Sequence, residues 1–395
     1  MPKKSVDVLL LLVLVIARVQ LDTLADNALP DRLADVRRLV EGWWPARSLT
    51  LLEHPQTDPV TMMLIVTAFG LVAVYALVDF WAASPRRPLN PAATYRLKLG
   101  LVYGIIALLV VGKTVLLMNL RHHSVPWSYS HDGGVIQTEV TVDYFLRGLN
   151  PYVEDYVNTP MAEWGIDRYR TALYHYPYLP WTFIVSTPFF LFFSRVWPGW
   201  FDERMVYLPL FVLTLALAQG LALKRRHKLA AVMLVGLNPV MALDVIFGLN
   251  DPFVLFWIVL AIYLALRGGN RNAALGSAAL GLACAAKPTA WFVVPFWLLY
   301  CGRDFWGSRL IPPRRVWKLH LTALLHRTWP LPAAALLLLL PWFVWNPAAM
   351  FDDVWRWSAG QGETGYQIWG WGASNLVLAL GLVADRFAYW PFILP

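Results

Sequence analysis

The chain has 395 residues, of which 58% are hydrophobic and only 15% are charged, whereas a soluble domain carries roughly 25% charged residues. This composition excludes a disordered chain, a collagen-like fibre and an ordinary cytosolic enzyme, and it leaves an integral membrane protein. The net charge of +8 is held in short basic clusters between apolar runs. Such clusters are typical of cytoplasmic loops and not of a nucleic-acid-binding face, so no nucleic-acid partner is expected. Cys284 and Cys301 provide neither a disulfide framework nor a Cys-rich zinc site.

A membrane-spanning helix needs about 20 mostly apolar residues, and several runs meet or approach that length. These runs lie near residues 6–21, 60–83, 97–120, 205–223, 229–247, 252–266, 274–286, 289–300, 331–345 and 373–384. The first run follows a basic start and precedes no small-residue cleavage site, so we interpret it as an uncleaved helix. The runs predict an all-α polytopic membrane protein with a bundle of roughly 9–11 transmembrane helices. A long outer loop with short juxtamembrane helices is expected to interrupt the bundle.

The basic residues predict the orientation, because cytoplasmic loops carry an excess of Lys and Arg. If Lys3 and Lys4 are cytoplasmic and each predicted helix carries the chain to the opposite side of the membrane, every dense basic cluster lies on the cytoplasmic side. The other clusters are Arg86, Arg87, Arg96 and Lys98; residues 224–228; Arg267 and Arg271; and the segment 303–327. The apolar stretch 181–197 is then predicted to lie along the outer surface, because a crossing there would move residues 224–228 outside.

Three polar segments remain on the predicted outer face, at about residues 22–58, 121–204 and 346–372, the last of them rich in Trp and Gly. We therefore expect three parts: N-terminal helices with an outer amphipathic segment (1–120), an outer functional loop (121–204) and a bundle with a Trp-rich loop (205–395). Long ordered loops usually carry function. The apolar stretch 387–395 either packs on the surface or precedes further helices.

The most informative motif, His131-Asp132-Gly133-Gly134, follows a predicted helix on the outer side. Two glycines after Asp132 indicate a turn close to the membrane surface. A short helix is predicted over 135–147, where a Gly-Leu-Asn-Pro sequence ends it. The motifs that follow are YHYPYLP (174–180), LNP (237–239), GLNDP (248–252) and LACAAKP (282–288).

Together with RGLNPY (147–152), these motifs resemble the GT-C class of membrane glycosyltransferases over about residues 130–300. Within that class they are most similar to the polyprenol-phosphate-mannose-dependent mannosyltransferase family. Members carry an acidic residue after their first helix, whereas two additional predicted helices precede Asp132. The resemblance implies a polyprenyl-phosphate-sugar donor, with mannose as the family default, a glycan or glycolipid acceptor, and a site at the outer face of the cell membrane.

The implied reaction assigns roles to two residues. An outer carboxylate, here Asp132, would deprotonate the acceptor hydroxyl, which attacks the anomeric carbon with inversion as the lipid phosphate leaves. Lys287 would bind that phosphate. Lys287 and Pro288 lie in the middle of residues 274–300, where a lysine costs about 2.5–3.5 kcal/mol at the bilayer centre and proline breaks the helix. Either a helix pair that turns back or a broken helix beside a polar cavity would present Lys287 to a head group.

Several other side chains are candidates for binding substrate, although each also has an ordinary structural interpretation as a turn, an interface anchor or a loop support. These candidates are Glu139, His131, His175, Arg204, Asp251 and Tyr152. His122, His123 and His131 are close in sequence but show no defined ligand geometry, so no metal is expected. No cofactor is expected either, and the chain has no Gly-rich phosphate loop after a strand, in agreement with a lipid-linked donor.

Two alternatives to this enzyme remain. A transporter or lipid flippase without chemistry would favour two related halves with broken helices at matching positions, and no such similarity is apparent. An oligosaccharide polymerase or ligase would also have long outer loops, but it is not expected to share the order of motifs from Asp132 to Lys287.

Overall fold

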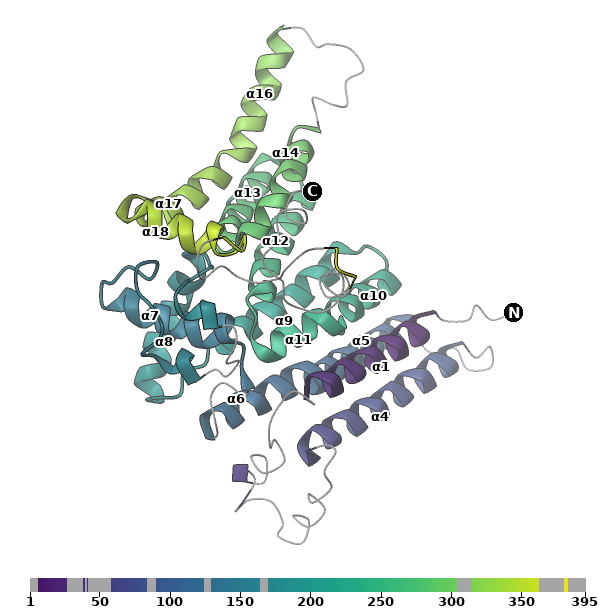
Figure 1. Ribbon diagram of the computed structural model, residues 1–395. Helices are drawn as coiled ribbons and strands as arrows, with labels where there is room; N and C mark the ends of the chain where they lie inside the picture. Colours follow the sequence, from purple (N-terminus) through teal and green to yellow (C-terminus); the bar gives the residue numbers. More distant parts are fainter. Residues whose placement is uncertain are drawn as a thin grey trace. The chain divides into compact units, whose positions relative to one another are not determined.

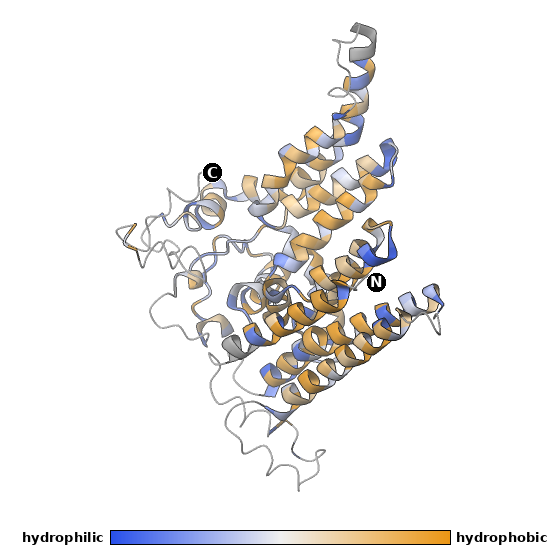
Figure 2. Cartoon of the chain, turned by 90° about the vertical axis from the view of Figure 1, so that its right-hand side faces the viewer, coloured by the Kyte–Doolittle hydropathy of each residue, from blue (hydrophilic) through white to orange (hydrophobic). Residues whose placement is uncertain are grey.

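The computed structural model describes residues 6–26, 38–39, 41, 58–83, 90–123, 129–163, 170–303, 314–361 and 380–382. These residues form helices and turns, and none of them lies in a strand. Four of the described helices are long and apolar enough to cross a membrane, and a bent helix pair would make a fifth. Their sides are hydrophobic and their hydrophilic residues gather near the helix ends (Figure 2). The predicted all-α polytopic class is thereby confirmed.

The four candidate spans are Pro59–Ala82, Pro91–His123, Arg204–Leu221 and Lys318–Trp345. They coincide with four of the apolar runs, and the second and fourth extend beyond the runs that predicted them. Several predicted features lie outside the described residues or at their margin. They are the predicted helix in 373–384, the apolar stretch 387–395, most of the outer segment 22–58, and the basic pair Arg86-Arg87.

The chain divides into two compact units, each made from two separate stretches. Unit 1 comprises Met1–His131 and Asp202–Arg267, and unit 2 comprises Asp132–Phe201 and Gly268–Pro395. The sequence predicted three consecutive parts instead. Chain order alone does not show that stretches on either side of the long loop pack into one unit, which is why the predicted boundaries at 120 and 204 group the helices differently.

Unit 1 contains a group of helices, of which the α-helices are labelled in Figure 1. They are α1 (Val6–Asp26), α4 (Pro59–Ala82), α5 (Pro91–Ile106), η2 (Ala107–Gly112), α6 (Lys113–His123), α9 (Arg204–Leu221), α10 (Arg225–Gly236), α11 (Pro239–Phe247) and α12 (Asp251–Leu266). Its core is aliphatic, with Leu11 of α1, Ile105 of α5 and Val232 of α10 among its fully or almost fully buried members. The π-helical turn η2 joins α5 and α6 into one continuous helix.

The predicted run 229–247 is divided into α10 and α11, which meet at an angle of 51°. The break has a local cause. Pro239 has no backbone N–H to continue the ladder, and the side chain of Asn238 instead accepts hydrogen bonds from the amides of Val240 and Met241 at 3.1 and 3.0 Å. Gly248 ends α11 with a left-handed φ of 80°.

Unit 2 holds the long loop and the C-terminal helices. Its elements are η4 (Asp132–Gln137), α7 (Thr138–Leu146), η5 (Pro160–Glu163), η6 (Arg170–Leu173), α8 (Trp181–Val196), α13 (Asn270–Cys284), η7 (Pro288–Val293), α14 (Val294–Cys301), α16 (Arg314–Thr328), α17 (Pro330–Trp345), α18 (Pro347–Phe351) and η8 (Asp352–Arg356). The stretch 181–197 is helical as predicted, and its placement along the outer surface remains a prediction. Helices α13 and α17 approach closely at Gly281, where a Cβ atom would lie 2.4 Å from the carbonyl oxygen of Leu331.

Residues 270–301 form a helical hairpin. Trp297 of α14 donates from Nε1 to Oγ of Ser277 in α13 at 2.7 Å. At the other end, the guanidinium of Arg327 bonds both the side chain of Asn270 and the carbonyl of Cys301, at 2.8 and 2.9 Å. The first and last residues of the segment are therefore close together, and its middle forms the turn. Of the two predicted arrangements around Lys287, the structure shows the helix pair that turns back.

Candidate functional site

Lys287 lies at the turn of the hairpin, after α13 has ended at Cys284. Three successive carbonyls at this turn accept hydrogen bonds: that of Cys284 from Trp291 Nε1 at 2.9 Å, that of Ala285 from the Trp181 amide at 2.9 Å, and that of Ala286 from the Leu179 amide at 3.0 Å. Backbone groups at membrane depth must be satisfied within the protein. These bonds allow the chain to turn there while Lys287 keeps an extended backbone (φ −154°, ψ 136°) and a half-buried side chain.

Tyr178 connects Lys287 to the Asp132 motif. Lys287 Nζ lies over the ring of Tyr178, 5.9 Å from its centroid, which is cation–π distance. The same ring packs on Gly133, where a Cβ atom would be 2.7 Å from the tyrosine hydroxyl and 3.0 Å from Cε2. The residue next to Asp132 must therefore be as small as glycine for the ring to occupy this place. One aromatic side chain thus contacts both the predicted acidic motif and the predicted phosphate-binding lysine.

Asp132 begins η4 and is half-buried, whereas the residues that follow it, from Gly133 to Gln137, are buried. Hydrogen bonds hold this turn in place. Thr138 donates from Oγ1 to the carbonyl of Gly133 at 2.8 Å, and Gln137 donates from Nε2 to the carbonyls of Ala172 and His175, both at 2.8 Å. The predicted helix over 135–147 is observed as the end of η4 followed by α7. The candidate base is therefore the first residue of an element that side-chain hydrogen bonds hold in place.

Tyrosines of the long loop support this arrangement from within. The hydroxyl of Tyr152 donates to the carbonyl of Tyr178 at 2.9 Å, and the hydroxyl of Tyr156 lies 3.0 Å from Oγ1 of Thr141. Burial raises the pKa values of Tyr152 and Tyr156 well above the ordinary range, so both hydroxyls stay neutral. Tyr152 is buried, with 3% of its surface exposed, and its hydroxyl bonds the backbone of Tyr178.

His175 and Asp353 join the long loop to the segment that follows α17. His175 Nδ1 is 2.8 Å from Asp353 Oδ1, the amide of Tyr176 donates to Asp353 Oδ2 at 2.9 Å, and the His175 ring stacks on Trp357. Burial raises the pKa of Asp353 to about 6, although the hydrogen bonds from His175 and Tyr176 act in the opposite direction. Two of the three polar segments predicted on the outer face, 121–204 and 346–372, are thus in direct contact.

The same cluster could offer ligands to a metal ion. One ligand atom from each of His175, Asp352 and Asp353 lies within 4.8 Å of the others. In the arrangement described, Asp353 bonds to His175, and Asp352 Oδ1 pairs with Arg356 at 3.1 Å. Protein partners therefore already occupy atoms of both carboxylates, so that an ion would have to compete with His175 and Arg356 for them.

Arg204 belongs to unit 1 and is completely buried. Its guanidinium donates to both carboxylate oxygens of Asp202 at 2.8 Å, and to the carbonyls of Tyr129 and Ile246 at 2.7 and 2.9 Å. Burial on its own would raise the pKa of Asp202, but the charges of Arg204 and Arg121 hold it well below its usual range. We propose that Arg204 anchors the start of α9 structurally, and not that it binds phosphate.

The remaining candidates divide between the units. His131, whose amide donates to the carbonyl of Phe247 at 2.7 Å, and Asp251, which begins α12, belong to unit 1. Glu139 is half-buried on the first turn of α7 in unit 2. Unit 2 therefore contains Asp132, Glu139, Tyr152, His175 and Lys287, five of the eight candidates.

Three residues of this site were not singled out from the sequence in the roles that they have. Tyr178 appeared only as one of several interfacial aromatics, Gly133 only as a turn residue, and Asp353 not at all. The one available signal was the position of Tyr178 within YHYPYLP, a motif that the resemblance had already marked. No local pattern indicates that Asp353, 178 positions after His175, contacts it.

Comparison with known proteins agrees with this location. A family model described as "Alpha-(1->6)-mannopyranosyltransferase, N-terminal domain" matches residues 135–303, less than half of the chain. The matched range includes Tyr152, Tyr178 and Lys287 and begins three residues after Asp132. No curated protein and no solved structure matches the chain. Residues 135–303 thus match a GT-C mannosyltransferase family, and the resemblance predicted from the motifs is confirmed.

Proposed function

We propose that this protein is a membrane mannosyltransferase that takes mannose from a polyprenyl-phosphate donor and transfers it to a hydroxyl of a glycan or glycolipid at the outer face of the cell membrane. The observation that carries the proposal is the contact of Tyr178 with both Gly133 and Lys287. It links the carboxylate motif, which immediately precedes the region that matches the family, to Lys287, which lies within that region.

In the proposed reaction, Asp132 accepts the proton of the acceptor hydroxyl while the hydroxyl oxygen forms a bond to the anomeric carbon of mannose. The bond between that carbon and the phosphate oxygen breaks with inversion, and the leaving phosphate keeps the electron pair. Lys287, held over the Tyr178 ring, offsets the developing negative charge on the phosphate. Tyr152 holds Tyr178 by its backbone and is a positioning residue in this scheme.

The test uses the full chain in lipid nanodiscs with radiolabelled polyprenyl-phosphate-mannose and lipid extracts as acceptors. We expect Asp132→Asn to reduce transfer by about 10²–10⁴-fold, the usual contribution of a general base. Lys287→Met is expected to reduce it by about 10²–10³-fold, as the loss of one charge-stabilising donor does. Asp143→Asn and Lys318→Met make the same chemical changes at exposed positions of unit 2 and should leave transfer unchanged.

Equal transfer by Asp132→Asn and Asp143→Asn would remove Asp132 as the base, and equal transfer by the two lysine variants would remove the phosphate assignment. The transporter alternative is tested in the same preparation with sealed vesicles. If the unaltered protein transferred no mannose but moved labelled donor across the vesicle membrane, the proposed enzyme activity would be replaced by transport.

A further inference from the structure

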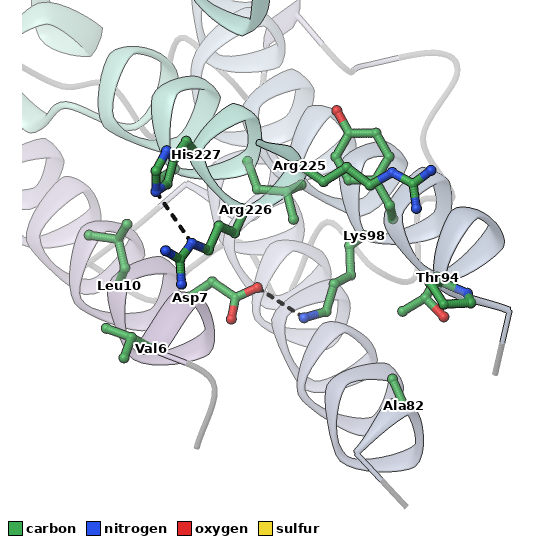
Figure 3. Close-up of a pocket in the computed structure, with 13 residues that line it drawn as sticks. Val6, Asp7, Leu10, Ala82, Thr94, Lys98, Arg225, Arg226 and His227 are labelled. Carbon is green, nitrogen blue, oxygen red and sulfur yellow. Dashed lines mark hydrogen bonds and ion pairs between the residues drawn. The ribbon is translucent and has the colours of Figure 1, made fainter. Parts of the chain in front are cut away.

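Unit 1 has a cavity of about 620 Å³ that the proposed function does not use. Four helix ends surround it: the beginnings of α1, α5 and α10 and the end of α4 (Figure 3). The volume falls within the range of roughly 300–1,000 Å³ that is typical of small-molecule sites. Its lining therefore indicates what kind of molecule would fit.

The polar part of the lining is cationic. Lys98, Arg225 and Arg226 line the cavity together with a single carboxylate, Asp7. Lys98 Nζ donates to Asp7 at 2.9 Å and also bonds Asp79, which lies outside the lining, so acidic partners offset its charge. The lining as a whole keeps an excess of positive charge.

The two arginines supply that excess. Among the described residues, neither Arg225 nor Arg226 forms an ion pair: Arg225 lies over the ring of Tyr95, 5.9 Å from its centroid, and Arg226 Nε is 3.3 Å from His227 Nε2. Both arginines are exposed at the start of α10. Their guanidinium groups are thus available to an anion, and guanidinium binds phosphate oxygens in a bidentate manner.

The rest of the lining is apolar. Val6 and Leu10 of α1, Ala82 of α4 and Leu229 of α10 form this part of the wall. The cavity also lies at the ends of α4 and α5, which belong to helices long and apolar enough to cross a membrane. A ligand in this cavity can place a charged group against the arginines and a hydrocarbon segment against the apolar wall.

The sequence independently assigns this end of the helices to the cytoplasmic side. In the chain, the basic residues 3–4, 86–87 and 224–228 adjoin the helix ends that line the cavity. We propose that the cavity binds the phosphate head group and first acyl carbons of an anionic phospholipid from the cytoplasmic leaflet. Basic pockets between transmembrane helices on that side are suited to such head groups.

The test measures lipid binding to the full-length purified protein by native mass spectrometry and by thermal protection in detergent, with phosphatidylglycerol, phosphatidylcholine and inorganic phosphate as separate probes. We expect phosphatidylglycerol to bind more tightly than phosphatidylcholine, and more weakly as salt is raised. The double substitution Arg225→Gln/Arg226→Gln should weaken phosphatidylglycerol binding about 10- to 30-fold, the loss expected for two cations at an anionic head group.

Two further variants separate the cavity from general surface charge. Arg267→Gln/Arg271→Gln removes the same charge from two exposed positions that do not line the cavity, and it should bind phosphatidylglycerol as the unaltered protein does. Ala82→Trp fills the cavity without a change of charge and should abolish tight binding.

Equal loss in both double variants, or undiminished binding in Ala82→Trp, would overturn the assignment of the lipid to this cavity. Protection by inorganic phosphate equal to that by phosphatidylglycerol would show that the ligand is free phosphate and not a lipid. Equal affinity for phosphatidylcholine would overturn the anionic selectivity. The measurement does not depend on mannose transfer, so it stands or falls separately from the proposed enzyme activity.

Discussion

Replacement of Asp353 by asparagine is expected to stabilise the protein at alkaline pH, although Asp353 bonds to a histidine. The carboxylate is buried, with 3% of its surface exposed, and burial raises its pKa from 3.8 to about 6. A difference of one pKa unit corresponds to about 1.4 kcal/mol, so the ionised carboxylate costs the folded state about 3 kcal/mol. Asparagine removes the charge and keeps an oxygen for the amide of Tyr176.

The sign of the pH dependence follows from the two pKa values. The carboxyl of the unfolded chain titrates near 3.8 and that of the folded chain near 6, so between these values the folded state binds more protons. The contribution of this carboxyl to stability should therefore fall as pH rises from about 4 to 6 and then remain level. Asp353→Asn should abolish this fall: the variant should match the unaltered protein near pH 4 and exceed it by up to about 3 kcal/mol at pH 8.

Asp353→Ala provides the contrast, because it removes the acceptor of the Tyr176 amide and the side-chain partner of His175 Nδ1. Each buried group left unsatisfied costs about 1–3 kcal/mol, so the two together should make this variant less stable than Asp353→Asn by about 2–6 kcal/mol at every pH. The assay is thermal unfolding of the three proteins in detergent between pH 4 and 8. If Asp353→Asn were destabilised at pH 8, the carboxylate would be a net stabilising group and the reasoning from burial would be wrong.

Three other substitutions test the packing. Gly281→Ala places a Cβ against the Leu331 carbonyl and should lower stability by about 1–3 kcal/mol in thermal unfolding. Gly100→Ala is the control, because a Cβ there would have no atom within 4 Å, and it should be neutral or stabilising. Equal effects of the two substitutions would contradict the close helix crossing. Gly133→Ala should displace Tyr178 and reduce mannose transfer by about 10-fold, an effect expected for a small misplacement. Addition of Tyr178→Phe, which removes the nearest atom, should restore part of that transfer, and the absence of any restoration would argue against the steric cause. Tyr152→Phe leaves the Tyr178 carbonyl without its donor and should cost about 1–3 kcal/mol, with unchanged stability as the contrary result.

Much of the helical architecture could be predicted because its determinants are local. A run of apolar residues predicts all or part of each of the four candidate spans. Lys287-Pro288 in the middle of residues 274–300 predicted a break that the structure shows as a hairpin turn. A proline also marks the bend at Asn238-Pro239, but residues 229–247 are mainly hydrophobic and were therefore interpreted as one run. Local sequence therefore identified where helices end when a charge accompanied the proline, and failed when proline occurred alone.

The organisation of the site could be predicted only in part, because it depends on contacts between distant residues. Asp132 and Lys287 were expected to act near each other, but the sequence did not show that Tyr178 lies against Lys287 and the glycine after Asp132. The partners of Arg204 could not be predicted either, because its guanidinium bonds the nearby Asp202 and two backbone carbonyls distant in the chain. Its assignment as a phosphate ligand from the sequence stays a prediction.

The hydrogen bonds from Leu179 and Trp181 to the carbonyls of Ala286 and Ala285 join peptide groups and not side chains. Substitutions at these four positions would therefore keep the hydrogen-bonding peptide groups. A proline at 179 or 181 would instead remove a donor, and a single inserted residue would shift both donors out of register with their acceptors. Homologous sequences should accordingly keep a constant length between the tyrosine-rich motif and the helix that follows it, with small residues at 285 and 286, where both alanines are completely buried.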